Sequence, residues 1–129
     1  MHKSRLAGFI IDCKTEDLEQ ATQFWSAALG YPIRALAEES DPQKYRELLP
    51  ENDTLHVEVQ KVDHDSRVHL DIETDDIEAE TQRLEKLGAK RVSKGLRWWI
   101  LEAPTGQRFC VVRPQRKDFA DRAKTWDRS

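Results

Sequence analysis

Apolar and polar residues alternate along residues 68–73, which read VHLDIE. The apolar positions are Val68, Leu70 and Ile72, and the polar positions are His69, Asp71 and Glu73. A period of two is typical of a β-strand whose two faces meet different surroundings. We expect the apolar side chains to pack beneath a helix and the polar side chains to line the opposite face of the sheet.

Helical spacing follows this strand and also occurs near the start of the chain. In residues 74–88, Ile77, Leu84 and Leu87 form an apolar stripe that ends before Gly88. An earlier stripe ends before Gly30 in the same way, and its members are Leu18, Ala21, Trp25, Ala28 and Leu29. The first helix is predicted to start at Thr15 or Glu16, and the second at Thr74 or Asp75. Asp75 and Asp76 are expected to satisfy the free backbone N–H groups at the start of the second helix.

The chain repeats itself after a shift of 59 residues (70 − 11), which places IDCKTEDLEQATQ (11–23) on LDIETDDIEAETQ (70–82). The identical pairs are Asp12 and Asp71, Thr15 and Thr74, Asp17 and Asp76, Glu19 and Glu78, Thr22 and Thr81, and Gln23 and Gln82. Self-similarity at a fixed shift indicates a duplicated structural unit.

Each copy contains one strand before its helix and three candidate strands after it. The strands before the helices are residues 7–13 and 67–73, and the later ones are residues 31–39, 44–49 and 54–62, and then 89–95, 97–103 and 107–113. We therefore predict an α+β fold of two tandem βαβββ repeats with a mixed, curved sheet and helices on its outer face. Residues 1–129 form a single domain, with repeat one at about 6–62, repeat two at about 66–113, and a tail at 114–129 that includes a short helix.

Charge and composition narrow the function classes. The formal net charge is −3, and Lys and Arg are interspersed with Asp and Glu, so no clustered basic surface is predicted and nucleic-acid binding is not expected. The apolar run before Asp12 is too short for a signal sequence or a membrane span, which favours a cytoplasmic protein without a membrane partner. Cys13 and Cys110 are then expected as free thiols.

The segments LEQATQFWSAALGY, VHLDIETDDIEAETQRLEKLGA and EAPTGQRFCVVRP occupy matching places in this tandem pattern. Together they resemble the vicinal oxygen chelate superfamily, which includes glyoxalase I, the bleomycin-resistance proteins and the extradiol dioxygenases. The resemblance covers about residues 6–113 and is greatest to small glyoxalase-like single-domain proteins. It implies a small-molecule ligand in a cleft between the two repeats, and a homodimer.

The metal-dependent members of that superfamily hold their ion with residues on the first and last strand of each repeat. The resemblance places His69 and Cys110 at the two positions of repeat two, and His56 with Ile10, or Gly8, at those of repeat one. The implied metal ligands are His56, His69 and Cys110, which could hold zinc. A magnesium or manganese ion would instead need oxygen from Glu58, Asp12 or Asp71.

The same resemblance supplies a candidate ligand cleft and two functional alternatives. The predicted lining residues are Asp12, Asp71, Trp98, Trp99 and Arg108, and the catalytic candidates are His69 and Glu58. Trp98 and Trp99 should face opposite sides of their strand, so that one enters the core beneath a helix and the other faces the cleft. The sequence does not fix which of the two does which. An equal alternative to a functional role for His69 is a neutral, hydrogen-bonded imidazole in a partly buried position. The alternative for Cys110 is that it is a small buried apolar residue of the core.

The first functional hypothesis is a protein that binds a small organic molecule without a cofactor. The alternative is a lyase, isomerase or dioxygenase whose divalent metal polarises neighbouring oxygens on the substrate. The residue pattern leaves open whether the ligand is turned over.

Overall fold

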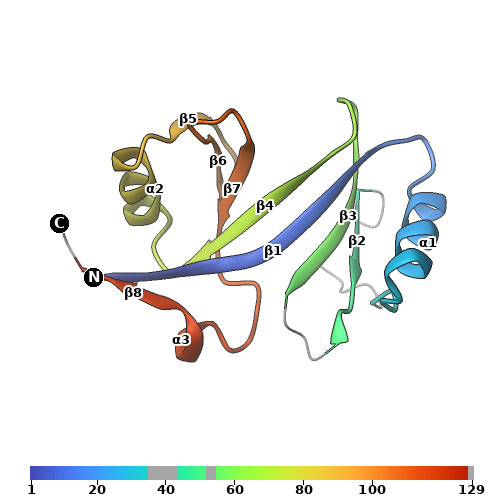
Figure 1. Ribbon diagram of the computed structural model, residues 1–129, viewed down its shortest axis with the longest axis horizontal. Coiled ribbons are helices and arrows are strands. Elements are labelled where there is room, and N and C mark those ends of the chain that lie inside the picture. Colours follow the sequence, from blue (N-terminus) through green and yellow to red (C-terminus); the bar gives the residue numbers. More distant parts are fainter. Residues whose placement is uncertain (35–43, 52–54, 128–129) are drawn as a thin grey trace. The chain divides into compact units, whose positions relative to one another are not determined.

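The computed structural model describes residues 1–34, 44–51 and 55–127, and within them the chain forms eight strands and three helices (Figure 1). In chain order these are β1 (His2–Lys14), α1 (Leu18–Leu29), β2 (Tyr45–Leu48), β3 (His56–Val62), β4 (Arg67–Thr74), α2 (Ile77–Lys86), β5 (Lys90–Lys94), β6 (Trp99–Glu102), β7 (Arg108–Val112), α3 (Phe119–Arg122) and β8 (Lys124–Trp126). The prediction of a mixed α+β fold is confirmed, and β4, α2, β5, β6 and β7 form the βαβββ pattern predicted for the second repeat. Of the first strand predicted after α1, only Ile33 is seen to pair, as an isolated bridge to Leu48, because residues 35–43 lie outside the described residues.

The chain divides into two compact units. The amino-terminal unit is Phe9–Val68, and the carboxy-terminal unit joins Met1–Gly8 to His69–Ser129, so the two halves of β1 belong to different units. None of the helices in the described part of the chain is long and apolar enough to cross a lipid bilayer.

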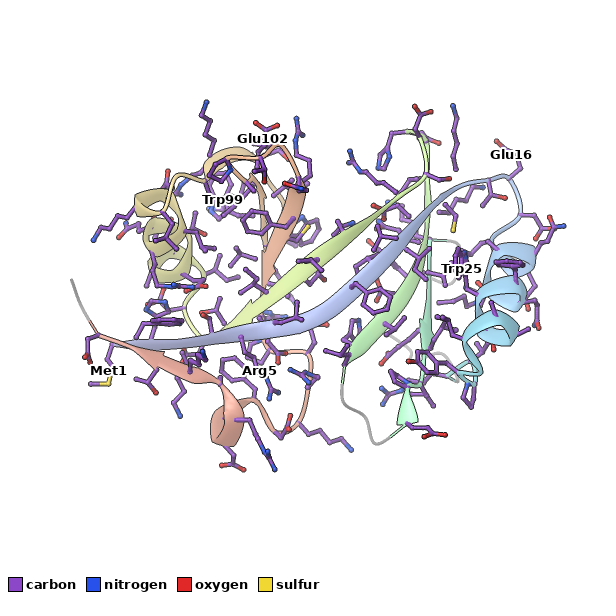
Figure 2. The ribbon with its side chains drawn as sticks, in the orientation of Figure 1. Met1, Arg5, Glu16, Trp25, Trp99 and Glu102 are labelled. Atoms are coloured by element: carbon purple, nitrogen blue, oxygen red, sulfur yellow. The ribbon has the colours of Figure 1, made fainter. Side chains whose placement is uncertain are left out.

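The amino-terminal unit packs α1 on strands in the order β2-β3-β1. β2 and β3 are antiparallel, with Leu48 opposite Val57. The apolar core consists of Leu18 from α1 and Leu48, Val57 and Val59 from the sheet, and Trp25 packs against it. Figure 2 shows Trp25 on the side of α1 that is turned toward these strands. The apolar stripe of the first predicted helix therefore faces the core through Leu18 and Trp25.

The carboxy-terminal unit has strands in the order β1-β4-β7-β6-β5, and the short β8 pairs with the start of β1. β4 and β7 are parallel, whereas β7, β6 and β5 are antiparallel neighbours. Helix α2 contacts β7 and β5, and its Leu84 joins Leu101 and Val111 in the core. One face of this sheet is thus covered by α2, and we call the other face the polar face because it carries His69, Asp71 and Glu73.

Both long helices begin with the same local hydrogen bonds. Asp17 is the N-cap of α1 and accepts the N–H of Gln20 at 3.0 Å, and Asp76 is the N-cap of α2 and accepts the N–H of Ala79 at 3.0 Å. The N-caps lie two residues after the predicted threonines and one residue after the alternative starts, Glu16 and Asp75. The difference has a local cause. The hydroxyls of Thr15 and Thr74 accept the N–H of these aspartates and close the turn before each helix.

The predicted stop of α1 is confirmed, since Gly30 caps it in the left-handed conformation at φ 73°.

The predicted burial of β4 is wrong at two positions. Val68 and Leu70 are 59% and 51% exposed, and only Ile72 packs against the core beneath α2. The helix contacts β7 and β5 rather than the first half of β4, so the start of the strand lies beyond its cover. On the polar face two side chains are buried rather than exposed, since Asp71 is 8% exposed and Glu73 is fully buried.

The tail forms the predicted short helix, α3, and adds a strand, β8, that the sequence pattern did not indicate. Buried Glu73 holds this tail in place. Its carboxylate accepts the Nε–H groups of Arg5 at 2.5 Å and Arg116 at 3.3 Å, and the backbone N–H of Gln115 at 2.6 Å. Arg5 also binds Asp118, and Figure 2 shows Arg5 on the side of β1 turned toward α3. One end of the polar face is therefore covered by the tail.

Candidate functional site

Three side chains with metal-binding or catalytic chemistry meet on the polar face of the carboxy-terminal unit. His69 and Asp71 are two residues apart on β4 and point to the same side, and the parallel register places Cys110 of β7 opposite Asp71. One donor atom from each residue lies within 4.8 Å of the other two. Asp71 is buried, and His69 and Cys110 are partly exposed. No other trio of His, Cys, Asp or Glu side chains gathers this closely among the described residues.

The Asp71 carboxylate has an unusual position. Its Oδ1 atom lies 3.4 Å from Nε2 of His69, but it is buried and has no hydrogen-bond partner among the described residues. A buried polar atom without a hydrogen bond is destabilising, and native structures contain few of them. The trio therefore presents an acceptor that a ligand hydroxyl, a water or a cation would satisfy.

His56 and Glu58 belong to the amino-terminal unit, whereas the trio belongs to the carboxy-terminal unit. Nε2 of His56 is 3.2 Å from Oε1 of Glu58, and Nδ1 is 3.5 Å from Oε1 of Glu47, which pairs with Glu58 across β2 and β3. The imidazole thus lies between two carboxylates. Within the carboxy-terminal unit the structure brings together two of the predicted metal ligands, His69 and Cys110. The joint set with His56 and the catalytic role of Glu58 stay predictions.

Asp71 was predicted to line the ligand site and to offer oxygen to a magnesium or manganese ion. It was not predicted to bind the same ion as His69 and Cys110. The signal for it was its spacing of two residues from His69, which puts both on one side of a strand. The register that brings Cys110 beside them cannot be read from the sequence, because β4 and β7 are separated by a helix and two strands.

The two tryptophans take the opposite environments that their spacing predicts. Trp99 packs into the core on the α2 side of the sheet, and the guanidinium of Arg91 lies 4.8 Å from its ring centroid (Figure 2). Trp98 is 39% exposed and lies before the start of β6, with its ring in the space that a side chain at Gly95 would need. Trp99 is therefore the tryptophan that packs against the core, and the ligand-lining role of Trp98 stays a prediction.

Arg108 and Asp12 complete the residues predicted to line a ligand site. Arg108 starts β7 two residues before Cys110, so it shares the polar face, and its Nε lies 3.3 Å from Oε1 of Glu102. Asp12 belongs to the amino-terminal unit, where it is 2% exposed and its Oδ2 is 3.9 Å from Nε of Arg67. The expected cleft shared by both repeats stays a prediction.

The thiol of Cys13 has a different environment from that of Cys110. Cys13 packs against the core of the amino-terminal unit, and burial raises its pKa, an effect that a hydrogen bond with Trp25 opposes. Both cysteines are free thiols, as predicted. Only Cys110 lies beside an imidazole and a carboxylate.

Residues 8–112 match the family described as Glyoxalase-like domain. The chain therefore belongs to the glyoxalase-like domain family. None of the curated proteins matches the chain.

Solved structures show a similar fold. The chain resembles the hypothetical protein BH1468 from Bacillus halodurans C-125, with a TM-score of 0.61, 14% identity, and coverage of 88% of this chain and 96% of that one. A glyoxalase/bleomycin resistance protein/dioxygenase superfamily member from Vibrio splendidus 12B01 is 18% identical over 84% of this chain and 99% of that one, with a TM-score of 0.48. Glyoxalase I from Zea mays is 21% identical over 87% of this chain but only 47% of its own, with a TM-score of 0.28. At 14% identity the likeness to the Bacillus halodurans protein concerns the fold alone.

Proposed function

We propose that this glyoxalase-like protein binds a small organic molecule on the polar face of its carboxy-terminal unit, around His69, Asp71 and Cys110. The observation that carries the proposal is the buried Oδ1 atom of Asp71, which lacks a hydrogen-bond partner among the described residues while an imidazole and a thiol lie within 4.8 Å. A ligand hydroxyl donated to this oxygen would remove the cost of the unsatisfied acceptor.

The chemistry of the neighbouring groups indicates the ligand class. Asp71 accepts a hydrogen bond, His69 donates or accepts one, and Arg108 contributes a positive charge two residues from Cys110 on the same strand. Since Arg108 is already paired with Glu102, its charge favours an anionic group without defining a closed anion pocket. A small molecule with two neighbouring oxygens and an acidic group fits this arrangement.

A second candidate function is metal-assisted catalysis on such a molecule. It is favoured by the nitrogen, oxygen and sulfur donors that meet within 4.8 Å, a combination that fits a divalent ion and leaves a position open for substrate. When bound, the ion would polarise the neighbouring oxygens of the substrate. His69, Asp71 and Cys110 would hold the ion, and the cluster alone does not identify the reaction.

The first experiment asks whether the polar face binds ligands. Amide and imidazole NMR shifts are followed while α-hydroxy acids, α-keto acids and aromatic diols are added to the metal-free protein. We expect at least one compound to shift signals of β4 and β7 in the wild type, and the shifts to be lost in His69→Ala. His64→Ala is the matched control, because His64 is an exposed loop histidine. Equal shifts in wild type and His69→Ala, or shifts confined to other strands, would contradict the proposal.

The two candidates separate on metal content. The protein is purified without a histidine tag and its metal is measured in the wild type, His69→Ala and His64→Ala. Stoichiometric metal that is lost only in His69→Ala supports the metal-assisted candidate. A wild type that takes up no divalent ion, even when supplemented, excludes that candidate and leaves ligand binding as the function.

A homodimer is also part of the proposal, and exposed apolar residues support it. Leu6 and Leu70 lie on the neighbouring strands β1 and β4 and are 43% and 51% exposed. Apolar surface of this kind favours contact with another protein surface. Light scattering during gel filtration tests it, since Leu70→Lys should shift a dimer toward monomer. The cytoplasmic location and the absence of nucleic-acid and membrane partners stay predictions.

A further inference from the structure

We infer that Cys110 makes the metal-binding form of this site thiophilic, so that His69, Asp71 and Cys110 together select zinc over magnesium and manganese. This inference rests on the metal-assisted candidate described above. It goes beyond that candidate because it assigns the choice of metal ion to one side chain, the Cys110 thiol.

The geometry of the three donors fits a tetrahedral zinc site. Zinc bonds to nitrogen, oxygen and sulfur are about 2.0–2.3 Å long, so two donors of one tetrahedron lie roughly 3.4–3.6 Å apart. Nε2 of His69 and Oδ1 of Asp71 already lie 3.4 Å apart, and all three donor atoms lie within 4.8 Å of one another. Small side-chain rotations of Cys110 would complete the triangle. Three protein ligands leave the fourth position open.

The neighbouring carboxylates argue against a site for a hard metal ion. Magnesium and manganese prefer six oxygen ligands, so further carboxylates would have to join Asp71. Glu73 follows Asp71 on the same face, but it is fully buried and bound by Arg5, Arg116 and backbone N–H groups. Glu102 is paired with Arg108. The trio therefore offers one carboxylate, one imidazole and one sulfur.

Sulfur decides the selectivity because a thiolate is a soft ligand that binds zinc strongly and magnesium weakly. On binding, the Cys110 sulfur forms a bond to the ion and the thiol proton leaves to solvent. The negative charges of the thiolate and of Asp71 together offset the charge of the divalent ion. The buried, unsatisfied Oδ1 atom of Asp71 is the independent sign that this cluster is arranged for a cation or a donor group.

The test uses cobalt as a spectroscopic substitute for zinc. Cobalt is titrated into the metal-free full-length protein, and the thiolate-to-cobalt charge-transfer band is recorded in the near ultraviolet. We expect one equivalent of cobalt to produce this band in the wild type, zinc to remove it by competition, and magnesium to leave it unchanged. Cys13→Ser is the matched control and should retain the band, because Cys13 packs in the core of the other unit.

Two variants test the role of Cys110. Cys110→Ser should lose the band and bind zinc at least about tenfold more weakly, the usual scale for a weakened metal ligand set. Cys110→Asp keeps a negative ligand of the oxygen type and should reduce the preference for zinc over manganese by at least about tenfold. Circular dichroism confirms that both variants are folded, and Asp71→Asn should weaken zinc binding while keeping the band.

The outcomes distinguish the inference from the function on which it rests. A band that persists in Cys110→Ser, or that is lost in Cys13→Ser, overturns the assignment of Cys110. Wild-type protein that binds magnesium or manganese without the band overturns the selectivity and preserves the metal-assisted candidate. Wild-type protein that binds none of these ions overturns both, whereas NMR shifts of β4 and β7 by organic ligands would still support the proposal of metal-free binding.

Discussion

Residues 11–23 and 70–82 correspond position by position, and their side chains form matching hydrogen bonds. Thr22 and Thr81 each donate to a backbone carbonyl four residues earlier at 2.7 Å, and Gln23 and Gln82 each donate to a glutamate four residues earlier at 3.0 Å. The helix starts of the two repeats are therefore equivalent down to single contacts.

The strands before those helices have diverged in chemistry. Ile10 of β1 corresponds to His69 of β4, and the exposed Lys14 corresponds to the fully buried Glu73. On the helix, Ala21 corresponds to the buried Glu80. The duplicated framework is thus maintained by local contacts. Buried aspartates occur in both copies, at Asp12 and Asp71, whereas among the described residues the buried glutamates Glu73 and Glu80 and the His69, Asp71 and Cys110 trio belong to the carboxy-terminal copy.

The largest expected effect of this divergence is at Glu73. Glu73→Ala leaves Arg5 and Arg116 without their buried partner, so we expect the free energy of unfolding to fall by about 3–5 kcal/mol. The corresponding change in the other repeat, Lys14→Ala, should stay within about 0.5 kcal/mol because Lys14 is exposed. Urea unfolding of both variants measures the difference. If Glu73→Ala lowered the free energy of unfolding as little as Lys14→Ala, the tail would not be held by Glu73.

The second effect concerns acid stability and Glu80, whose counterpart in the first repeat is the uncharged Ala21. Burial alone would raise the pKa of Glu80, but hydrogen bonds from Arg83, His2 and Ser4 outweigh it and lower the pKa below its usual value. A lowered pKa in the folded state stabilises the protein above the unfolded pKa of about 4.3, and this stabilisation is lost as the pH falls through the folded pKa.

Thermal unfolding between neutral and strongly acidic pH tests this prediction. We expect Glu80→Gln to be less stable than wild type at neutral pH, and its stability to fall less steeply in acid. Parallel pH profiles for the two proteins would mean that Glu80 does not contribute to acid unfolding.

The third effect should be equal in the two repeats. Asp17→Ala and Asp76→Ala each remove an N-cap that accepts one backbone N–H, so each should lower the free energy of unfolding by about 1 kcal/mol. Asp17→Ser and Asp76→Ser keep a capping oxygen and serve as controls. A large difference between the two alanine variants would show that the matching hydrogen bonds do not carry matching energies.

The smallest effect is expected at the exposed glutamines. Gln23→Ala and Gln82→Ala each remove a side-chain pair spaced by four residues on a helix, which is worth about 0.2–0.5 kcal/mol. Denaturant midpoints for the two variants should therefore lie close to that of the wild type and to each other. A loss above about 1 kcal/mol at either position would point to contacts beyond the pair.

Sequence patterns predicted the fold class, both long helices and most strands, but they were less reliable for burial. Val68 and Leu70 alternate correctly with polar residues, yet they are exposed because α2 does not cover that part of β4. The sequence did not fix which of Trp98 and Trp99 enters the core, and the structure shows that Trp99 packs against it. A period of two shows that two faces differ, and only the position of the helix shows which residues it covers.

The sequence by itself determined the repeat, the helix starts at Asp17 and Asp76 to within a residue or two, and the stop at Gly30. These features depend on hydrogen bonds between residues that are two to five positions apart, so nearby residues are sufficient to specify them. The tertiary structure decided which charges are buried and which side chains meet.

Asp71 and Cys110 are 39 residues apart (110 − 71), and the parallel register of β4 and β7 places them side by side. Glu73 finds Arg5 on β1 and Arg116 on the tail, 68 and 43 residues away. Such long-range pairs form only when the strands take one register, because a shift of a single residue would turn each side chain to the opposite face.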